Sequence, residues 1–239
     1  MTPKRADALW RVIHDNLSAD IAAGRYAPGD KLPTEAALAT RFGVNRHTVR
    51  RALGALAERG VIFSRRGAGT FVTHDPADYP IGTRVRFHQN LRAAGRLPAK
   101  EILGLETRAA DAAETEALRL AAGARVHVYH GLSLADGMPV ALFRSSFPAD
   151  RFPDLPETLA RLKSVTAALA EHGVPDYTRA STRLNAKLAS PTQALHLHLA
   201  PGAPILRTIA INVDSAGQPI EYGRTWFAGD RITLTLTGP

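Results

Sequence analysis

Hydrophobic residues recur at helical spacing near the start of the chain and predict two helices. The first covers Leu9 to Ile21, where the apolar residues fall on one face, and Gly24 follows as a stop signal. The second begins after Thr34, a good N-cap residue, with Glu35 near the positive end of the helix dipole. Gly43 is expected to end this second helix.

A third helix is predicted to begin at Arg46, because the preceding Asn45 is a good N-cap residue. Its core-facing stripe consists of four apolar residues at positions i, i+3, i+4 and i+7: Val49, Ala52, Leu53 and Leu56. Four basic residues lie outside this stripe: Arg46, His47, Arg50 and Arg51. Arg46 and Arg50 are one turn apart, where like charges repel, so a polyanion would relieve this repulsion. A solvated arginine face is the alternative interpretation.

Two short β-branched and aromatic runs, residues 61–63 and 70–72, predict a hairpin after the third helix. Its tip carries two arginines and two glycines: Arg65, Arg66, Gly67 and Gly69. The glycines would let the backbone approach a phosphate or enter a minor groove. The helix pair with this hairpin predicts a winged helix-turn-helix; an ordinary flexible hairpin is the alternative.

The positive charge of the chain is concentrated in this part. Of the formal net charge of +8, residues 1–75 hold 12 Lys+Arg against 7 Asp+Glu, and the remaining 164 residues hold 18 against 15. A basic excess favours nucleic acid or an anionic surface as a partner. The absence of cysteine excludes disulfides and thiolate catalysis. No secretory or membrane-spanning segment is evident, so a cytoplasmic protein without a membrane partner is expected.

The chain is predicted to hold a DNA-binding domain at 1–73, a linker at 74–80 that contains two prolines, and an α+β domain at 81–239. Strands of the second domain are expected near residues 101–107, 126–134, 139–147, 177–189, 205–213, 219–226 and 232–236. Helices are expected near residues 87–94, 110–120, 164–172 and 192–199. Hairpin signals at Asp136-Gly137 and Ala216-Gly217 indicate a largely antiparallel sheet.

Residues 6–73 resemble the winged-helix domain of the GntR transcription regulators. The matching residues are Pro28-Gly29-Asp30-Lys31-Leu32-Pro33-Thr34-Glu35, Leu38-Ala39, Phe42-Gly43-Val44-Asn45-Arg46, Val49-Arg50, Ala52-Leu53, Leu56, Gly60 and Gly67-Ala68-Gly69-Thr70-Phe71-Val72. The chain departs from the pattern at Ala36, where a basic residue is frequent in the family.

The resemblance implies which residues contact DNA. Arg46 and Arg50 would contact base edges or phosphates, Thr48 a phosphate, and Arg66 with Gly67 would lie at the tip of the wing. Arginine in the major groove can donate two hydrogen bonds to guanine. The remaining members of the predicted DNA-binding set are Thr34, Glu35, Asn45, His47, Arg65 and Gly69.

The second half resembles the effector domain of the HutC-type branch of this family, which implies a chorismate lyase-like fold. Within that branch the chain is most similar to the phosphonate-metabolism regulators. The residues that carry this likeness are Asn45 to Ala52, Asp78-Tyr79-Pro80, Arg86-Phe87, Gln89-Asn90-Leu91, Thr182-Arg183, Arg207-Thr208 and Glu221-Tyr222.

A small anionic effector is expected in the second domain. Arg84 and Arg86 precede a helix that contains Phe87 and Asn90, and Ser164 begins another, so guanidinium and N–H donors could meet one anion. In several HutC-type proteins two arginines on the strand before a hairpin bind an acidic effector. Here those positions are Gly131 and Ser133, so Arg183, Arg207 or Arg224 is expected to supply the charge. Glu221, Tyr222 and Phe227 match the C-terminal pocket pattern of the branch.

Metal and catalytic sites are not predicted. The rings of His196 and His198 would point about 200° apart on a helix, so one ion could not bridge them. Ser145-Ser146 lacks a nucleophile-elbow setting. We therefore predict a dimeric repressor that needs no cofactor, binds a pseudo-palindromic double-stranded operator and responds to an anionic effector related to phosphonate or phosphate. The alternatives are a HutC-type regulator of sugar or amino-acid catabolism and a lyase-like enzyme.

Overall fold

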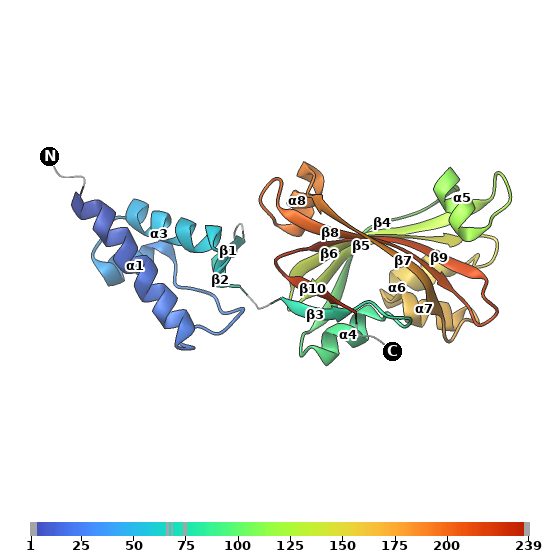
Figure 1. The fold of residues 1–239 in the computed structure, drawn as a ribbon, viewed down its shortest axis with the longest axis horizontal. Helices are drawn as coiled ribbons and strands as arrows, with labels where there is room; N and C mark the ends of the chain where they lie inside the picture. Colours follow the sequence, from blue (N-terminus) through green and yellow to red (C-terminus); the bar gives the residue numbers. More distant parts are fainter. Residues whose placement is uncertain (1–3, 66, 68, 74–75, 237–239) are drawn as a thin grey trace. The chain divides into compact units, whose positions relative to one another are not determined.

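The chain folds into two compact units. The computed structural model describes residues 4–65, 67, 69–73 and 76–236. The units comprise residues 1–75 and 76–239, and each has its own hydrophobic core (Figure 1).

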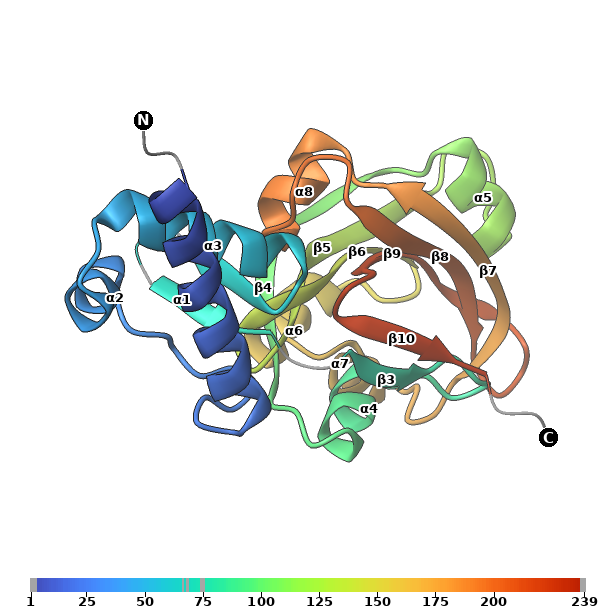
Figure 2. The same ribbon diagram turned by 60° about the vertical axis from the view of Figure 1, so that its left-hand side comes forward.

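The first unit contains three helices and a hairpin. The helices are α1 (Lys4–Ala22), α2 (Glu35–Phe42) and α3 (Arg46–Glu58), and the strands are β1 (Ile62–Arg65) and β2 (Gly69–Val72). Figure 2 shows α1 lying across α3, with α2 at the N-terminal end of α3. The predicted stripe of Val49, Ala52, Leu53 and Leu56 is buried in the core of this unit.

Sequence-encoded caps fix the turn between α2 and α3. The Thr34 hydroxyl accepts a hydrogen bond from the Ala37 N–H at 3.2 Å. Gly43 ends α2 with φ of 62°, in the left-handed region that glycine adopts without a steric penalty. Asn45 then caps α3, so the two helices are connected by only three residues, as the sequence predicts.

The second unit is built on one six-stranded antiparallel sheet with the order β4-β5-β6-β9-β8-β7. Its strands are β4 (Pro98–Ala109), β5 (Arg125–Ala135), β6 (Met138–Pro148), β7 (Thr178–Leu188), β8 (Pro204–Val213) and β9 (Pro219–Ala228). A smaller parallel sheet pairs β3 (Ala77–Pro80) with β10 (Ile232–Thr235).

Helices cover both faces of the large sheet. One face packs against α4 (Phe87–Ala93), α6 (Leu155–Leu162), α7 (Val165–Glu171) and the small sheet. The other packs against α5 (Ala112–Leu118) and α8 (Pro191–Leu197). Figure 1 shows these two groups on opposite sides of the strands. Because side chains alternate along a strand, neighbouring residues of β9 contact different groups.

The second unit begins before the end of the expected linker. Positions 74 and 75 of that linker lie outside the described residues, but Ala77 to Pro80 form β3. Ala77 and Tyr79 are buried while Asp78 and Pro80 are exposed, so this short segment has the alternation of a strand. The prolines that favour a linker are tolerated, because Pro80 lies at the end of the strand.

Helix α6 has no counterpart among the expected helices. Its segment follows Pro148 and Pro153 and contains Pro156, a composition that favours a loop. Pro156 lies in the first turn of α6, where its missing N–H is not needed for a helical hydrogen bond. Within the described residues, no helix is long and apolar enough to span a membrane, and no cluster of three or more histidine or acidic residues could hold a metal ion.

Candidate DNA-binding surface and ligand cavity

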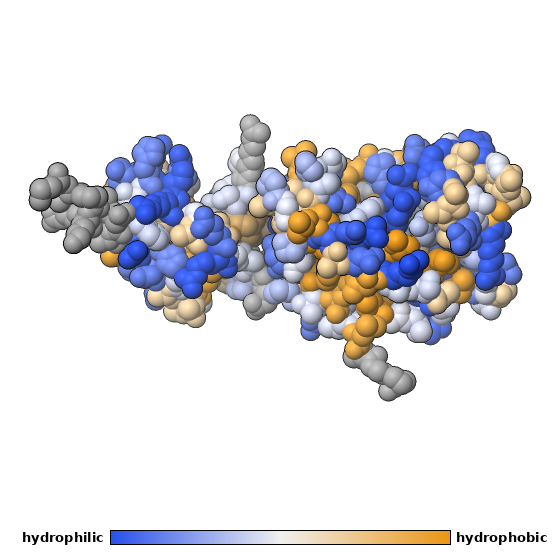
Figure 3. Space-filling model, turned by 45° about the horizontal axis from the view of Figure 1, so that its top comes forward, coloured by the Kyte–Doolittle hydropathy of each residue, from blue (hydrophilic) through white to orange (hydrophobic). Residues whose placement is uncertain are grey.

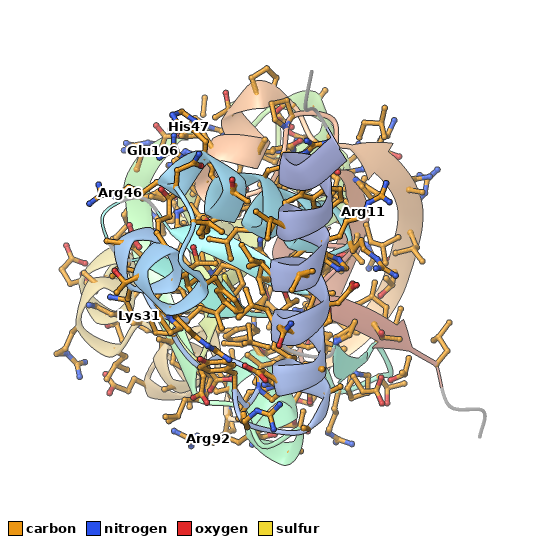
Figure 4. The ribbon with its side chains drawn as sticks, turned by 90° about the vertical axis from the view of Figure 1, so that its left-hand side faces the viewer. Arg11, Lys31, Arg46, His47, Arg92 and Glu106 are labelled. Atoms are coloured by element: carbon orange, nitrogen blue, oxygen red, sulfur yellow. The ribbon has the colours of Figure 1, made fainter. Side chains whose placement is uncertain are left out.

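The N-terminal half of α3 presents basic side chains to solvent. Arg46, His47, Arg50 and Arg51 are exposed, whereas Val49 between them is fully buried. Figure 4 shows Arg46 and His47 pointing outward from the start of α3. The side chain of Arg46 makes no hydrogen bond or ion pair with any other described residue. Its guanidinium is therefore available to an external acceptor.

Arg50 is also exposed, but it is held by a carboxylate of α2. Its Nε and Nη2 donate to the two oxygens of Glu35 at 3.1 and 2.8 Å. The hydrogen bonds from Arg50 lower the pKa of Glu35, and the same contact raises the pKa of Arg50. This pair fixes the orientation of the guanidinium while its Nη1 edge is left for another acceptor.

Asn45 and Thr48 are joined at the start of α3. The Asn45 side-chain oxygen accepts from the Thr48 N–H at 2.9 Å and from the Thr48 hydroxyl at 3.0 Å. The Asn45 amide nitrogen therefore remains as a donor beside the exposed arginines.

The hairpin has the predicted strands and turn. β1 and β2 pair from Ile62 with Val72 to Arg65 with Gly69. The Arg65 side chain and all of Arg66 lie outside the described residues. Gly67 and Gly69 have φ of 76° and 117°, and a Cβ on Gly69 would lie 2.7 Å from the Lys31 Cε. Lys31, absent from the predicted set, therefore packs its side chain against the tip end of the wing.

The second unit encloses a cavity of about 660 Å³. Its floor is formed by the face of the large sheet that α6 and α7 cover, and its walls come from β3, α4, the α6–α7 region and β7. The floor carries small residues along neighbouring strands, including Ser133, Ala141, Ala210 and Gly223. These small side chains leave the space that larger residues would otherwise fill.

Lys100 contributes a cation to this cavity. Its Nζ lies 3.9 Å from the ring centroid of Phe143, 5.4 Å from that of Phe87 and 5.8 Å from that of Tyr129. Burial lowers the pKa of Lys100 to about 8, while Glu221 acts in the opposite direction. Within the described residues, Lys100 makes no hydrogen bond or ion pair.

Glu221 places a carboxylate elsewhere on the cavity wall. The Ser145 hydroxyl donates to one of its oxygens at 2.5 Å, and the Asn212 amide donates to the other at 2.6 Å. Arg179 donates to the Asn212 side-chain oxygen at 3.3 Å, so it supports this carboxylate indirectly. Glu221 itself is only 8% exposed.

Two families match the chain, one in each unit. Residues 9–72 match the bacterial regulatory proteins of the gntR family, and residues 93–233 match the UTRA domain. The chain belongs to the GntR family of transcription regulators, in its HutC type with a UTRA domain. Members of this family bind DNA, and the UTRA domain binds small-molecule effectors. The large antiparallel sheet is accordingly the chorismate lyase-like sheet of that domain.

Full-length relatives share this organisation. An uncharacterized HTH-type transcriptional regulator of Rhizobium meliloti is 41% identical over 230 residues, covering 96% of this chain and 94% of that protein. The mannosyl-D-glycerate transport/metabolism system repressor MngR of Escherichia coli is 30% identical, with 95% of each chain covered. The crystal structure of PhnF from Mycobacterium smegmatis matches with a TM-score of 0.67 and 27% identity, covering 95% and 99% of the two chains.

Five residues of the effector set predicted for this regulator line the cavity: Arg86, Phe87, Ser164, Glu221 and Phe227. The charge of Arg86 is already compensated, because its Nη2 donates to Asp176 at 3.0 Å and to the Tyr177 carbonyl at 2.7 Å. Ser164 accepts from the Ala167 N–H at 3.3 Å and thereby caps α7.

The other four predicted effector residues do not line the cavity. Arg84 forms an exposed ion pair with Asp176 at 2.7 Å, and the Asn90 amide donates to the Pro80 carbonyl at 3.2 Å. Arg224 faces α5, where its Nη2 lies 3.9 Å from Glu114. Arg183 pairs in register with Ile209, which packs on that same α5 face. The alternation of side chains along β7 and β9 therefore directs these arginines away from the cavity.

Lys100 is the main cavity residue absent from the sequence-based prediction, and Ser133, predicted only as the position of a family arginine, also lines the cavity. The strand was expected to begin at Glu101, which left Lys100 outside it, whereas Lys100 pairs in register with Ser133. One sequence signal could have placed Lys100 on the strand. Lys100 is two residues before Ile102, which packs against the core under α6, and residues two apart on a strand face the same side. A side chain at Gly131 is excluded, because its Cβ would lie 2.1 Å from the Glu101 carbonyl oxygen.

Proposed function

We propose that this regulator is a repressor that binds a pseudo-palindromic operator through α3. Binding of an effector in the UTRA cavity controls whether the repressor stays on the operator or leaves it. The observation that carries the DNA-reading role is the exposed guanidinium of Arg46, which makes no hydrogen bond or ion pair with another described residue, on a capped helix with a buried opposite face. The repressor role is supported by MngR, which is named as a repressor and is similar along nearly its whole length. Such a protein would act in the cytoplasm, where bacterial DNA lies.

The effector proposed for the cavity is a small anion, such as an organophosphonate or a phosphate compound. The uncompensated charge of Lys100 supports an anion, and the likeness to PhnF-type proteins supports this chemical class. We propose reversible binding without turnover, so that the occupant acts as a signal.

A homodimer is proposed because a pseudo-palindrome requires two copies of α3. Strand β7 is an edge strand of the large sheet, and its residues are mostly exposed, including Leu184 and Leu188 at 45% and 73%. Figure 3 shows hydrophobic residues gathered on one face of the second unit. An unpaired strand edge with exposed leucines is a favourable surface for pairing with a second copy.

A competition gel shift tests the DNA-reading role. The full chain is mixed with labelled DNA from upstream of its own gene and with either unlabelled specific DNA or random DNA. Arg46→Ala should remove about 1 to 3 kcal/mol of preference for the specific DNA, because a base contact is lost. Arg161→Ala is the charge-matched control, since Arg161 forms only an exposed ion pair with Glu171. An equal loss on specific and random DNA would make Arg46 a phosphate contact instead.

A further inference from the structure

A half-buried cation, Lys100, and a buried carboxylate, Glu221, line the cavity without an ion pair between them. Lys100 and Glu221 both line it, yet within the described part of the chain neither forms an ion pair. Burying charges without an opposite charge in contact is costly. Both groups line the same cavity, and Glu221 acts to raise the pKa of Lys100.

The surroundings of Lys100 are positive. His88 and Arg92 lie one turn apart on α4 and also line the cavity. The pKa of His88 is lowered by burial, then by Lys100 and by Arg92, which places all three basic groups near one another. Ser133 pairs in register with Lys100, is 4% exposed, and makes no side-chain hydrogen bond with a described residue. This end of the cavity therefore offers positive charge and a free hydroxyl to an anion.

The direct partners of Glu221 are neutral, and Arg179, which also lines the cavity, reaches this carboxylate only through Asn212. Each of its oxygens accepts one neutral hydrogen bond, from Ser145 or Asn212, and each retains a second acceptor site. Among the described residues that line the cavity, Glu221 is the only acidic one. A positively charged donor that reaches this carboxylate would supply the missing counter-charge.

We propose that the effector is a small zwitterion whose acidic group binds Lys100 and Ser133 and whose ammonium group binds Glu221. This proposal rests on the proposed function, because it names the chemical class of the effector at that same site. The shared chemistry is an acid and an amine separated by a short linker, and the acid is either a phosphonate, a phosphate ester or a carboxylate. Such a molecule supplies a counter-charge to Lys100 and to Glu221 at once, which neither a simple anion nor a simple amine can do.

Isothermal titration calorimetry on the full chain tests the proposal with five probes. They are 2-aminoethylphosphonate, O-phosphoethanolamine and β-alanine as zwitterions, methylphosphonate as an acid without an amine, and ethanolamine as an amine without an acid. At least one zwitterion should bind at least about tenfold more tightly than methylphosphonate and ethanolamine, because it gains a second charge-assisted contact. The strongest of the three identifies the acidic group. If none of the three zwitterions binds more tightly than methylphosphonate, the proposal is overturned.

Two variants test which residue binds the acidic end of the ligand and which binds its ammonium end. Lys100→Met should weaken binding of both methylphosphonate and the preferred zwitterion at least about tenfold. Glu221→Gln should leave methylphosphonate binding unchanged and abolish the preference for the zwitterion. Lys187→Met is the control, because Lys187 pairs with Ile205 on the face of the sheet that packs against α8. Unchanged methylphosphonate binding in Lys100→Met, or an unchanged preference in Glu221→Gln, would overturn the assignment.

The gel shift without ligand separates this proposal from the proposed function. Specific DNA binding together with no response to any zwitterion would overturn the effector class and leave the regulator role intact. Zwitterion binding by a chain that shows no specific DNA binding would support the cavity assignment and contradict the operator-reading role. Circular dichroism of each variant confirms that a loss of binding does not reflect a loss of fold.

Discussion

Single charged residues of this regulator differ in how their charge is compensated. Arg86 is paired with Asp176, and Arg50 is paired with Glu35, so both guanidinium groups have a counter-charge within the chain. Lys100 has aromatic rings around its ammonium, and no carboxylate of a described residue forms an ion pair with it. Burial lowers its pKa from the ordinary value of 10.5 to about 8.

The lowered pKa of Lys100 predicts how the free energy of unfolding changes with pH. Between pH 8 and 10.5 the unfolded chain holds a proton that the folded chain has released, so the free energy of unfolding attributable to Lys100 rises with pH in that window. At pH 7, below both pKa values, Lys100 is charged in the folded protein, and the cost of partly desolvating that charge is fully present. We therefore expect Lys100→Met to be more stable than the natural chain at pH 7, and this difference should shrink towards pH 10.5.

Urea unfolding at a series of pH values measures this difference. Glu221 and His88 also influence the cavity, but they are present in both proteins. Lys187→Met provides the comparison for loss of an exposed lysine. A stability difference between Lys100→Met and the natural chain that does not change from pH 7 to 10.5 would contradict the assigned pKa.

At the scale of elements, helices and strands with a clear hydrophobic period were predictable, and the face that each residue occupies was not. The caps at Thr34, Asn45 and Gly43 specify α2 and α3 through local hydrogen bonds and backbone conformation. The strands of the second unit have helices on both faces, so their apolar pattern does not tell which face forms the cavity. This is why Glu221 and Arg224 were predicted together, whereas Glu221 lines the cavity and Arg224 faces α5.

The contact between α2 and α3 predicts a role for Glu35 in specificity. Glu35→Gln removes a negative charge near the DNA-binding face and releases the guanidinium of Arg50 from its paired hydrogen bonds. Affinity for random DNA should therefore rise several-fold, because repulsion of phosphates is lost, while the ratio of specific to random binding falls. Fluorescence anisotropy with both DNA fragments at one salt concentration measures this ratio.

Since the pair of Glu35 and Arg50 is exposed, the free energy of unfolding should change by less than about 1 kcal/mol. An unchanged or increased ratio would show that Glu35 does not orient Arg50 for reading.

At the scale of the whole molecule, the proposed dimer gives a prediction about mass. Light scattering should show twice the chain mass of 25.7 kDa, and Leu184→Asp should produce the monomer, because a charge is introduced on the exposed edge of β7. Arg161→Ala, which leaves β7 unchanged, should remain dimeric. A Leu184→Asp protein that stays dimeric would place the interface elsewhere.

A DNase I footprint of the full chain on the DNA upstream of its own gene tests whether α3 reads an operator. The proposed function requires two copies of α3 in successive major grooves of one site. We expect two protected half-sites related by a dyad, both lost in Arg46→Ala and both kept in Arg161→Ala. Absence of protection by the natural chain, or full protection by Arg46→Ala, would contradict the claim that α3 reads an operator.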